Sequence, residues 1–238
     1  KAAAAIRQMH ACGLLGAILP EWARIDCMVV RDYYHRYTVD EHTIVAIENL
    51  EAIEDPRFRD LAGEVDNQAV LRFALLLHDC GKASGQDHTS ESERLAAEAG
   101  RRLGIPGEEL AAVRKLIARH LELSSTMNSR DMDDPAPARS LAASVDTEEF
   151  LKMLALLTYA DISAVNPTAM TPWRRDQLWR AYVRAYEELT RELDTERIHD
   201  FDDADPQTRY FVEGLPSRYL RTHSLEEIHG HAALTRDA

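Results

Sequence analysis

The sequence predicts an all-α fold, and three observations favour this class. Apolar residues recur at helical spacing through most of the chain. Helix-start signals such as Thr38-Val39-Asp40-Glu41 precede these apolar stretches, and Gly or Pro follows them. No stretch of useful length alternates apolar and polar residues in the way a half-buried strand does. We therefore expect a helical protein without a sheet.

The first half of the chain predicts four helices, each an apolar stripe between start and stop signals. The stop signals are Pro20, Asp55-Pro56, Gly81 and Gly104. The third helix is the most apolar and is expected to be buried, and a polar loop from Gly81 to Asp87 should follow it. The four segments are residues 2–18, 38–53, 67–80 and 89–103.

The second half predicts three more helices and a short fourth. The residues Asp146-Thr147-Glu148-Glu149 form a second capping box, Thr171-Pro172 begins the last long helix, and a third box begins at Ser224. The stretch from Ser124 to Pro137 has the composition of a loop. The helices are expected at residues 107–123, 150–165, from 172 onward and from 224 onward. Beyond residue 194 the sequence becomes acidic and less regular, so we expect one domain at 1–194 and an extension at 195–238.

Composition excludes several classes of protein. The chain has 238 residues and a net charge of −13, which disfavours a nucleic-acid partner because a phosphate-binding face needs clustered Lys and Arg. No apolar run approaches the length of a membrane span. The chain has three cysteines, Cys12, Cys27 and Cys80, whose spacing does not match a metal-binding motif. An odd number of cysteines argues against a disulfide framework. We therefore expect a cytoplasmic protein.

Polar side chains that can bind metals interrupt the apolar stripes. His78 and Asp79 end the most apolar helix, and Asp161 is in helical register with the apolar residues before it. A carboxylate there is costly to bury unless a cation or donor meets it. His42 lies one turn inside its helix and His120 shares a face with apolar neighbours. Imidazoles and carboxylates that point inward from several buried helices predict a metal site in a bundle core.

Each residue also has an ordinary structural explanation. A single buried His, such as His42 or His120, is more often a hydrogen-bonded core residue. Asp161 alone could cap a helix or pair with Arg. Chance is expected to produce about one His-Asp pair in a chain of this composition, and we interpret the second copy, His199-Asp200, as that coincidence. The metal hypothesis depends on the combination, because these explanations would have to coincide on successive helices.

The order His42, His78-Asp79, Asp161 resembles the signature of the HD superfamily of metal-dependent phosphohydrolases. Longer words resemble the HD domain of bacterial PII uridylyltransferase/uridylyl-removing enzymes, over roughly residues 6–231. These words are Tyr37-Thr38-Val39-Asp40-Glu41-His42-Thr43, His78-Asp79-Cys80-Gly81-Lys82, Gly85-Gln86-Asp87-His88-Thr89, Ala160-Asp161-Ile162-Ser163-Ala164-Val165-Asn166-Pro167, Thr171-Pro172-Trp173, Leu215-Pro216-Ser217-Arg218-Tyr219-Leu220 and Ser224-Leu225-Glu226-Glu227-Ile228. Cys80 departs from the family pattern, as does the absence of a basic residue at 83–86.

This resemblance implies an HD-type helical bundle with a metal site in its core. His42, His78, Asp79 and Asp161 would bind a divalent metal, with Mn²⁺ or Mg²⁺ favoured and Fe or Zn admitted by the mixed N/O ligands. The catalytic residues would be Asp79, Lys82, His88 and His120. His88 and His120 resemble the ligands of a second metal, and the alternative is that they contact phosphate or act as a general acid. Lys82 would neutralise the phosphate, or else it is a solvated loop lysine.

The implied activity is hydrolysis of the tyrosine–UMP phosphodiester on uridylylated PII signalling protein, part of nitrogen regulation. The full-length protein is expected to carry linked nucleotidyltransferase and ACT domains, whose motifs these 238 residues lack. Two alternatives stay open. One is an HD-type nucleotide phosphohydrolase or phosphodiesterase acting on a small molecule. The other is a non-catalytic regulatory HD domain.

Overall fold

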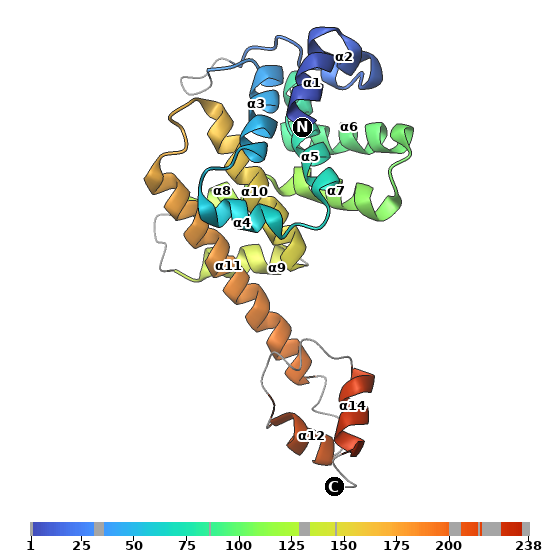
Figure 1. Cartoon of the computed structure of the whole chain (residues 1–238), viewed down its shortest axis with the longest axis vertical. Helices are drawn as coiled ribbons and strands as arrows, with labels where there is room; N and C mark the ends of the chain where they lie inside the picture. The colour runs from blue at the N-terminus through green and yellow to red at the C-terminus, as the bar shows by residue number, and fades with distance from the viewer. Residues whose placement is uncertain are drawn as a thin grey trace. The chain divides into compact units, whose positions relative to one another are not determined.

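The computed structural model is helical, as the sequence predicts. It describes residues 2–30, 36–85, 87–128, 134–145, 147–199, 206–213, 215 and 225–234. These residues form α-helices and short 3₁₀ turns, and none of them lies in a strand. The prediction of an all-α fold is therefore confirmed (Figure 1).

The chain divides into two compact units, Lys1–Ala185 and Tyr186–Ala238. The first contains every candidate site residue and all helices up to the first half of α11 (Pro172–His199). The second contains the rest of α11, α12 (Pro206–Glu213) and α14 (Leu225–Leu234), which lies where a short helix after Ser224 is predicted. The predicted domain limit after residue 194 falls inside α11.

Helix α10 (Glu148–Val165) is the centre of the first unit. It packs against α3 (Val39–Glu51), α4 (Pro56–Gly63), α5 (Gln68–Leu77) and α7 (Gly107–Arg119) (Figure 1). Apolar side chains are buried around its whole circumference, from Phe150 and Leu151 to Ala164. A helix that is apolar on all sides has to be covered on all sides. This explains why the polar residue Asp161, near its C-terminal end, has neighbours from several other helices.

Capping side chains fix where three of these helices begin. Asn67 accepts a hydrogen bond from the N–H of Val70 at the start of α5, and Thr147 accepts one from Phe150 at the start of α10. The predicted box at α10 is thus displaced by one residue, and its first member, Asp146, is outside the described residues. Thr171 accepts from the N–H of Arg174 and begins α11 as predicted. Thr38 stands at the N-cap of α3 but makes no capping bond with its side chain, so the predicted box is wrong there.

The N-terminal third contains two differences from prediction. Residues 2–18 form two helices, α1 (Ala2–Ala11) and α2 (Leu14–Ile18), because Gly13 adopts a left-handed φ of 74° that ends the first one. The sequence also predicts no helix at 56–63. Asp55-Pro56 ends one helical region and starts the next, because Asp55 caps α4 through the N–H of Arg57 and proline is tolerated in the first turn.

The middle of the chain contains two further differences. Helix α6 (His88–Leu103) ends at Gly104 as predicted, with a φ of 71°. The predicted helix at 107–123 instead ends at Arg119, and α8 (Glu122–Met127) begins after a turn at His120-Leu121. The predicted loop from Ser124 to Pro137 is therefore partly helical. A helix that was not predicted, α9 (Ala136–Ser144), begins after Pro135, where loop-like composition hides a helix start.

The hydropathy of the helices and the state of the cysteines are as follows. No helix in the described part of the chain is long and apolar enough to cross a membrane. Cys12 and Cys27 are exposed free thiols, and Cys80 is a buried one.

Candidate metal centre

Each of the four candidate ligands stands at a helix end or within about one turn of it. His42 lies in the first turn of α3, and its N–H donates to the carbonyl of Thr38 at 2.8 Å. His78 is the C-cap of α5, and Asp79 precedes the 3₁₀ turn η2 (Cys80–Ser84). Asp161 lies one turn before the end of α10. Because α3, α5 and α10 pack together, these ends meet at one place in the core.

The four side chains form one cluster, in which three are buried and Asp161 is 22% exposed. A ligand atom of each lies within 4.8 Å of a ligand atom of every other, so a single ion could contact all four. His42 Nε2 lies 2.9 Å from Asp161 Oδ1, and His78 Nε2 lies 3.3 Å from Asp79 Oδ2 and 3.5 Å from Asp161 Oδ1. His42, His78 and Asp79 are at most 2% exposed. The structure thus brings together the four residues that the sequence singled out for the first metal.

The ring of His78 has a defined orientation. Its Nδ1 lies 2.7 Å from the carbonyl oxygen of Leu75, which can only accept a hydrogen bond, so Nδ1 carries a proton. Nε2 is buried, has no well-formed hydrogen bond, and faces the two carboxylates. In the neutral ring this leaves a lone pair pointing at two anionic oxygens. That arrangement is unfavourable unless a proton or a metal ion lies between them.

The pKa values of His78, Asp79 and Asp161 also indicate that a positive charge is favoured between these side chains. Burial alone would lower the pKa of His78, but the charges of Asp79 and Asp161 raise that pKa to about 9. Burial would raise the pKa of Asp79, but His78 and Lys82 lower it to about 2. Burial also opposes ionisation of Asp161, and hydrogen bonding to His42 and His78 nevertheless lowers its pKa well below the usual range. Both carboxylates are therefore ionised at neutral pH and attract a positive charge.

A second cluster shares Asp79 with the first. Asp79, His88 and His120 also have ligand atoms within 4.8 Å of one another. His120 is the C-cap of α7 and is 2% exposed, and its Nδ1 lies 2.6 Å from the carbonyl oxygen of Ile117, so its Nε2 is the ring nitrogen without a proton in the neutral form. Burial and the nearby His78 lower the pKa of His120. His88 is the first residue of α6, one residue before the predicted start of this helix, and it is therefore held by the helix and not by the preceding loop.

Lys82 belongs to the same centre. Its Nζ lies 2.6 Å from Asp79 Oδ2, and its side chain is 20% exposed. The lysine is therefore engaged with the cluster, and the alternative of a solvated loop lysine does not describe it. Asp79 contacts residues of both clusters and Lys82, which makes it the common member of the whole centre.

Close packing against α6 fixes the turn that carries Asp79 and Lys82. The N–H of Gly81 donates to Oγ of the fully buried Ser92 at 2.8 Å. A Cβ atom on Gly81 would lie 2.2 Å from the carbonyl oxygen of His88 and 2.6 Å from the N–H nitrogen of Ser92. Only glycine fits so close to another backbone. No sequence pattern distinguishes Ser92, because its position opposite Gly81 is set by the packing of α6 on the turn.

A third group of His and Asp side chains, which the sequence analysis missed, lies at the N-terminal end of the unit. His10, Asp26 and Asp40 are close enough together to suggest an ion site. The indole N–H of Trp22, however, donates to His10 Nδ1 at 3.1 Å. The proton of the neutral ring must then be on Nε2, which lies 3.2 Å from Asp40 Oδ2 and has no lone pair for a metal. We interpret this group as a hydrogen-bond relay that anchors α1 to the start of α3.

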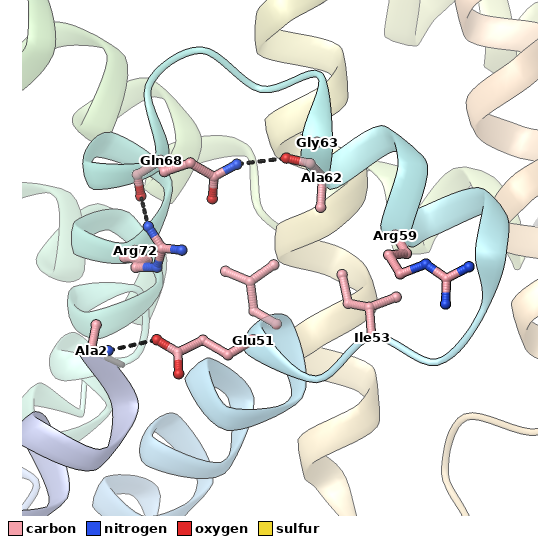
Figure 2. A pocket seen from close by; sticks show the side chains of 9 residues that line it. Ala2, Glu51, Ile53, Arg59, Ala62, Gly63, Gln68 and Arg72 are labelled. Carbon is pink, nitrogen blue, oxygen red and sulfur yellow. Dashed lines mark hydrogen bonds between the residues drawn. The ribbon is translucent and has the colours of Figure 1, made fainter.

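A cavity of about 640 Å³ lies elsewhere in the unit (Figure 2). It is lined by the C-terminal end of α3, α4 and the start of α5, and Glu51 and Arg72 are among its polar side chains. Glu51 is nine residues from His42 along α3, roughly 13 Å at the rise of a helix. It accepts a hydrogen bond from the N–H of Ala2, and Arg72 donates to the carbonyl of Gln68, as Figure 2 shows. None of the candidate site residues lines this cavity.

Comparison with known proteins identifies related sequences. The family model described as "HD domain" matches residues 39–164, which include all the clustered side chains of both candidate metal groups. Three curated relatives carry the name bifunctional uridylyltransferase/uridylyl-removing enzyme. The one from Gluconobacter oxydans is 38% identical over 188 residues, covering 76% of this chain and 20% of the relative. The one from Azospirillum brasilense is 34% identical over 237 residues, covering 90% and 25%. The one from Methylococcus capsulatus is 36% identical over 197 residues, covering 80% and 22%. The chain thus spans about a fifth to a quarter of the length of these relatives.

Proposed function

Because the chain belongs to the HD-domain family, we propose that it is a metal-dependent phosphohydrolase whose first metal is bound by His42, His78, Asp79 and Asp161. The observation that carries this proposal is the buried Nε2 of His78, which has no well-formed hydrogen bond and faces two ionised carboxylates at 3.3 and 3.5 Å. A cation there would satisfy all three groups at once.

The donor set fits a divalent ion. Two imidazoles and two carboxylates suit Mn²⁺ or Mg²⁺, and they also admit Fe or Zn. Nδ1 of His78 donates to a backbone carbonyl, the supporting interaction that commonly fixes a metal-binding imidazole. The same interaction at His120, together with Asp79 as a shared carboxylate, supports a second ion held by Asp79, His88 and His120.

We propose roles for the remaining residues of the centre. An ion at this centre would lower the pKa of bound water and stabilise charge on the phosphoryl oxygens. The oxygen of a water molecule forms the new bond to phosphorus, and the bond from phosphorus to the alcohol or phenol oxygen breaks. Lys82, oriented by Asp79, supplies a positive charge near the phosphate. His88 is less buried than His120 and is the residue closer to solvent for contact with substrate.

The proposed substrate is the tyrosine–UMP phosphodiester of a uridylylated PII signalling protein. The curated relatives are named for uridylyl removal, and they match most of this chain. A phenol is a good leaving group, with a pKa of about 10, so it needs little protonation as it departs. Nucleotidyltransferase and ACT domains linked to this chain would correspond to the remaining length of the relatives.

The proposal is tested with Asp79→Ala and a matched exposed control, Asp60→Ala. Metal content is measured by elemental analysis, and release of UMP is measured from uridylylated PII and from a panel of small nucleotides. Asp79→Ala should lose metal and lose hydrolysis of uridylylated PII, while Asp60→Ala keeps both. Wild-type turnover in Asp79→Ala would refute the metal centre. Turnover of small nucleotides without turnover of uridylylated PII would refute the substrate.

A further inference from the structure

A pocket of about 220 Å³ is lined by residues that follow two candidate metal ligands, Asp161 and His120, along the chain, although none of the candidate site residues lines it. Its wall on α10 is formed by Ile162 and Val165, which follow Asp161 by one and four residues. Its opposite wall is formed by α8, which begins two residues after His120 and packs against α10. The pocket therefore begins within one helical turn, roughly 6 Å, of a candidate metal ligand. Side chains on a helix lean toward its N-terminus, so Val165 leans toward Asp161.

Apart from Arg174, the described side chains that line this pocket are apolar or uncharged. Its apolar surface comes from the buried Met127 together with Ile162 and Val165. The carboxamide of Asn128 adds a group that can both donate and accept hydrogen bonds, whereas Oδ1 of Asn166 already accepts from the N–H and the hydroxyl of Thr168. None of the described lining residues is acidic, although the chain carries a net charge of −13. Such a surface fits a flat, uncharged ring with polar edges.

Among the described residues that line this pocket, Arg174, near the start of α11, is the charged one. Its Nη1 donates to the carbonyl of Ala169 at 3.0 Å, which fixes the guanidinium in place. Within the part of the chain that the structure describes, no carboxylate lies within ion-pair distance of Arg174, whereas arginines such as Arg94 and Arg175 are paired. A fixed guanidinium offers only donors, which match carbonyl oxygens of a ligand.

We propose that this pocket is the nucleoside subsite of the centre, and that it binds the pyrimidine-dione and ribose of the nucleotidyl group. This inference rests on the proposed function, because it takes the phosphate of the same substrate to lie at the metal centre. Met127, Ile162 and Val165 contact the faces of the ring. Arg174 donates to a ring carbonyl and disfavours cytosine, which has an amino group where uracil has a carbonyl.

Two diesters with the same leaving group test the inference. Uridine 5′-(4-nitrophenyl) phosphate carries the nucleoside, and methyl 4-nitrophenyl phosphate does not. Wild-type protein supplied with Mn²⁺ should hydrolyse the uridine ester with a kcat/KM at least about tenfold higher. Val165→Phe fills the pocket and should remove that preference, mainly through KM, while kcat/KM for the methyl ester stays within about twofold. Arg174→Gln should lower kcat/KM for the uridine ester relative to the cytidine ester.

Arg180→Gln, an exposed arginine further along α11, is the matched control and should behave as wild type with each of the esters. Equal loss on the uridine and methyl esters in Val165→Phe would overturn the inference, as would an unchanged preference in both pocket variants. If Val165→Phe does not fold, Arg174→Gln still decides the question, because its side chain is exposed.

Binding of UMP, measured by calorimetry, separates this inference from the proposed function. UMP should bind wild-type protein and bind Val165→Phe at least about tenfold more weakly. If wild type hydrolyses neither ester but shows this difference in UMP binding, the proposed function fails and the nucleoside subsite stands. If wild type hydrolyses both esters equally and UMP binding does not respond to Val165→Phe, the subsite fails and the hydrolase stands.

Discussion

Replacement of Gly81 by alanine should separate the two halves of the metal centre. Gly81 lies between Asp79 and Lys82 on the η2 turn, and it packs directly on the first turn of α6, where His88 stands. The added Cβ would lie 2.2 Å from the carbonyl oxygen of His88, which is backbone and cannot rotate away. The turn and the helix must therefore move apart.

The size of the movement follows from the contact distances. Reaching even a tight contact of 3.0–3.4 Å requires a separation of roughly 1 Å, and an ordinary contact of 3.4–4 Å requires more. The same movement stretches the 2.8 Å hydrogen bond from the N–H of Gly81 to Oγ of Ser92. Overpacking of a core costs about 1–3 kcal/mol of stability. A misplacement of about 1 Å in a catalytic centre can cost about 100-fold in rate, and we expect a loss of that order in Gly81→Ala.

The assay compares Gly81→Ala with Gly85→Ala, a change at the other end of the same turn. Gly85 has a φ of 69° and no atom within 4 Å of an added Cβ, so alanine there strains the backbone by about 1–2 kcal/mol without pushing on α6. Both variants should lose stability in chemical denaturation. Only Gly81→Ala should lose hydrolysis of uridylylated PII and affinity for a second metal. Activity of Gly81→Ala within about threefold of wild type would show that contact with α6 does not position the centre.

Three further predictions concern metal binding and stability. In the metal-free protein the pKa of His78 is raised to about 9, so at pH 7 an ion must displace the proton of this ring. The affinity for Mn²⁺, measured by calorimetry, should therefore rise with pH and level off near pH 9. A flat profile from pH 7 to 9 would contradict this. His120→Ala should bind about one ion fewer by elemental analysis, and unchanged stoichiometry would exclude the dinuclear centre. Asp55→Ala should lower the free energy of unfolding in urea by about 2–3 kcal/mol, because Asp55 caps α4 and pairs with Arg57 and Arg175 while only 6% exposed. Asp55→Asn keeps the cap and should recover about 1 kcal/mol; equal losses in the two variants would mean that the cap contributes nothing.

The sequence predicts that His42, His78, Asp79 and Asp161 lie together, because a polar side chain on a buried helix is costly unless it meets a partner. Asp161 interrupts a helix that is apolar on every side, and His78-Asp79 follows the most apolar run in the chain. A polar residue in such a place requires a partner, and the structure brings these partners together. The sequence indicates His42 less clearly, because its pattern is also that of an ordinary core histidine. Only in the structure does the distance of 2.9 Å between its Nε2 and Asp161 Oδ1 distinguish it.

Other features depend on tertiary contacts that no local pattern contains. The break at Gly13 depends on a backbone angle, and the sequence shows only two glycines, Gly13 and Gly16, within an otherwise helical pattern. The turn at His120-Leu121 interrupts a stripe that continues smoothly in the sequence, because α8 leaves the direction of α7 to pack on α10. The pocket beside Asp161 is assembled from α8, α10 and Arg174, and its residues have no common spacing. Each of these three features is determined by which parts of the chain pack against each other in the folded protein.

The long sequence separation within the first cluster has a consequence for how the protein folds. His42 and Asp161 are 119 residues apart, and their contact forms only when α3 docks on α10. Closing so long a loop is slow compared with helix formation, so a refolding chain should regain its helices before it can hold an ion tightly. Once held, an ion shared by these two residues acts as a cross-link. In the loop-entropy description a link closing about 100 residues restricts the unfolded chain by about 4–5 kcal/mol. A chelator should then act on this protein mainly by removing that restraint, and the released domain should unfold sooner while its individual helices keep their intrinsic stability.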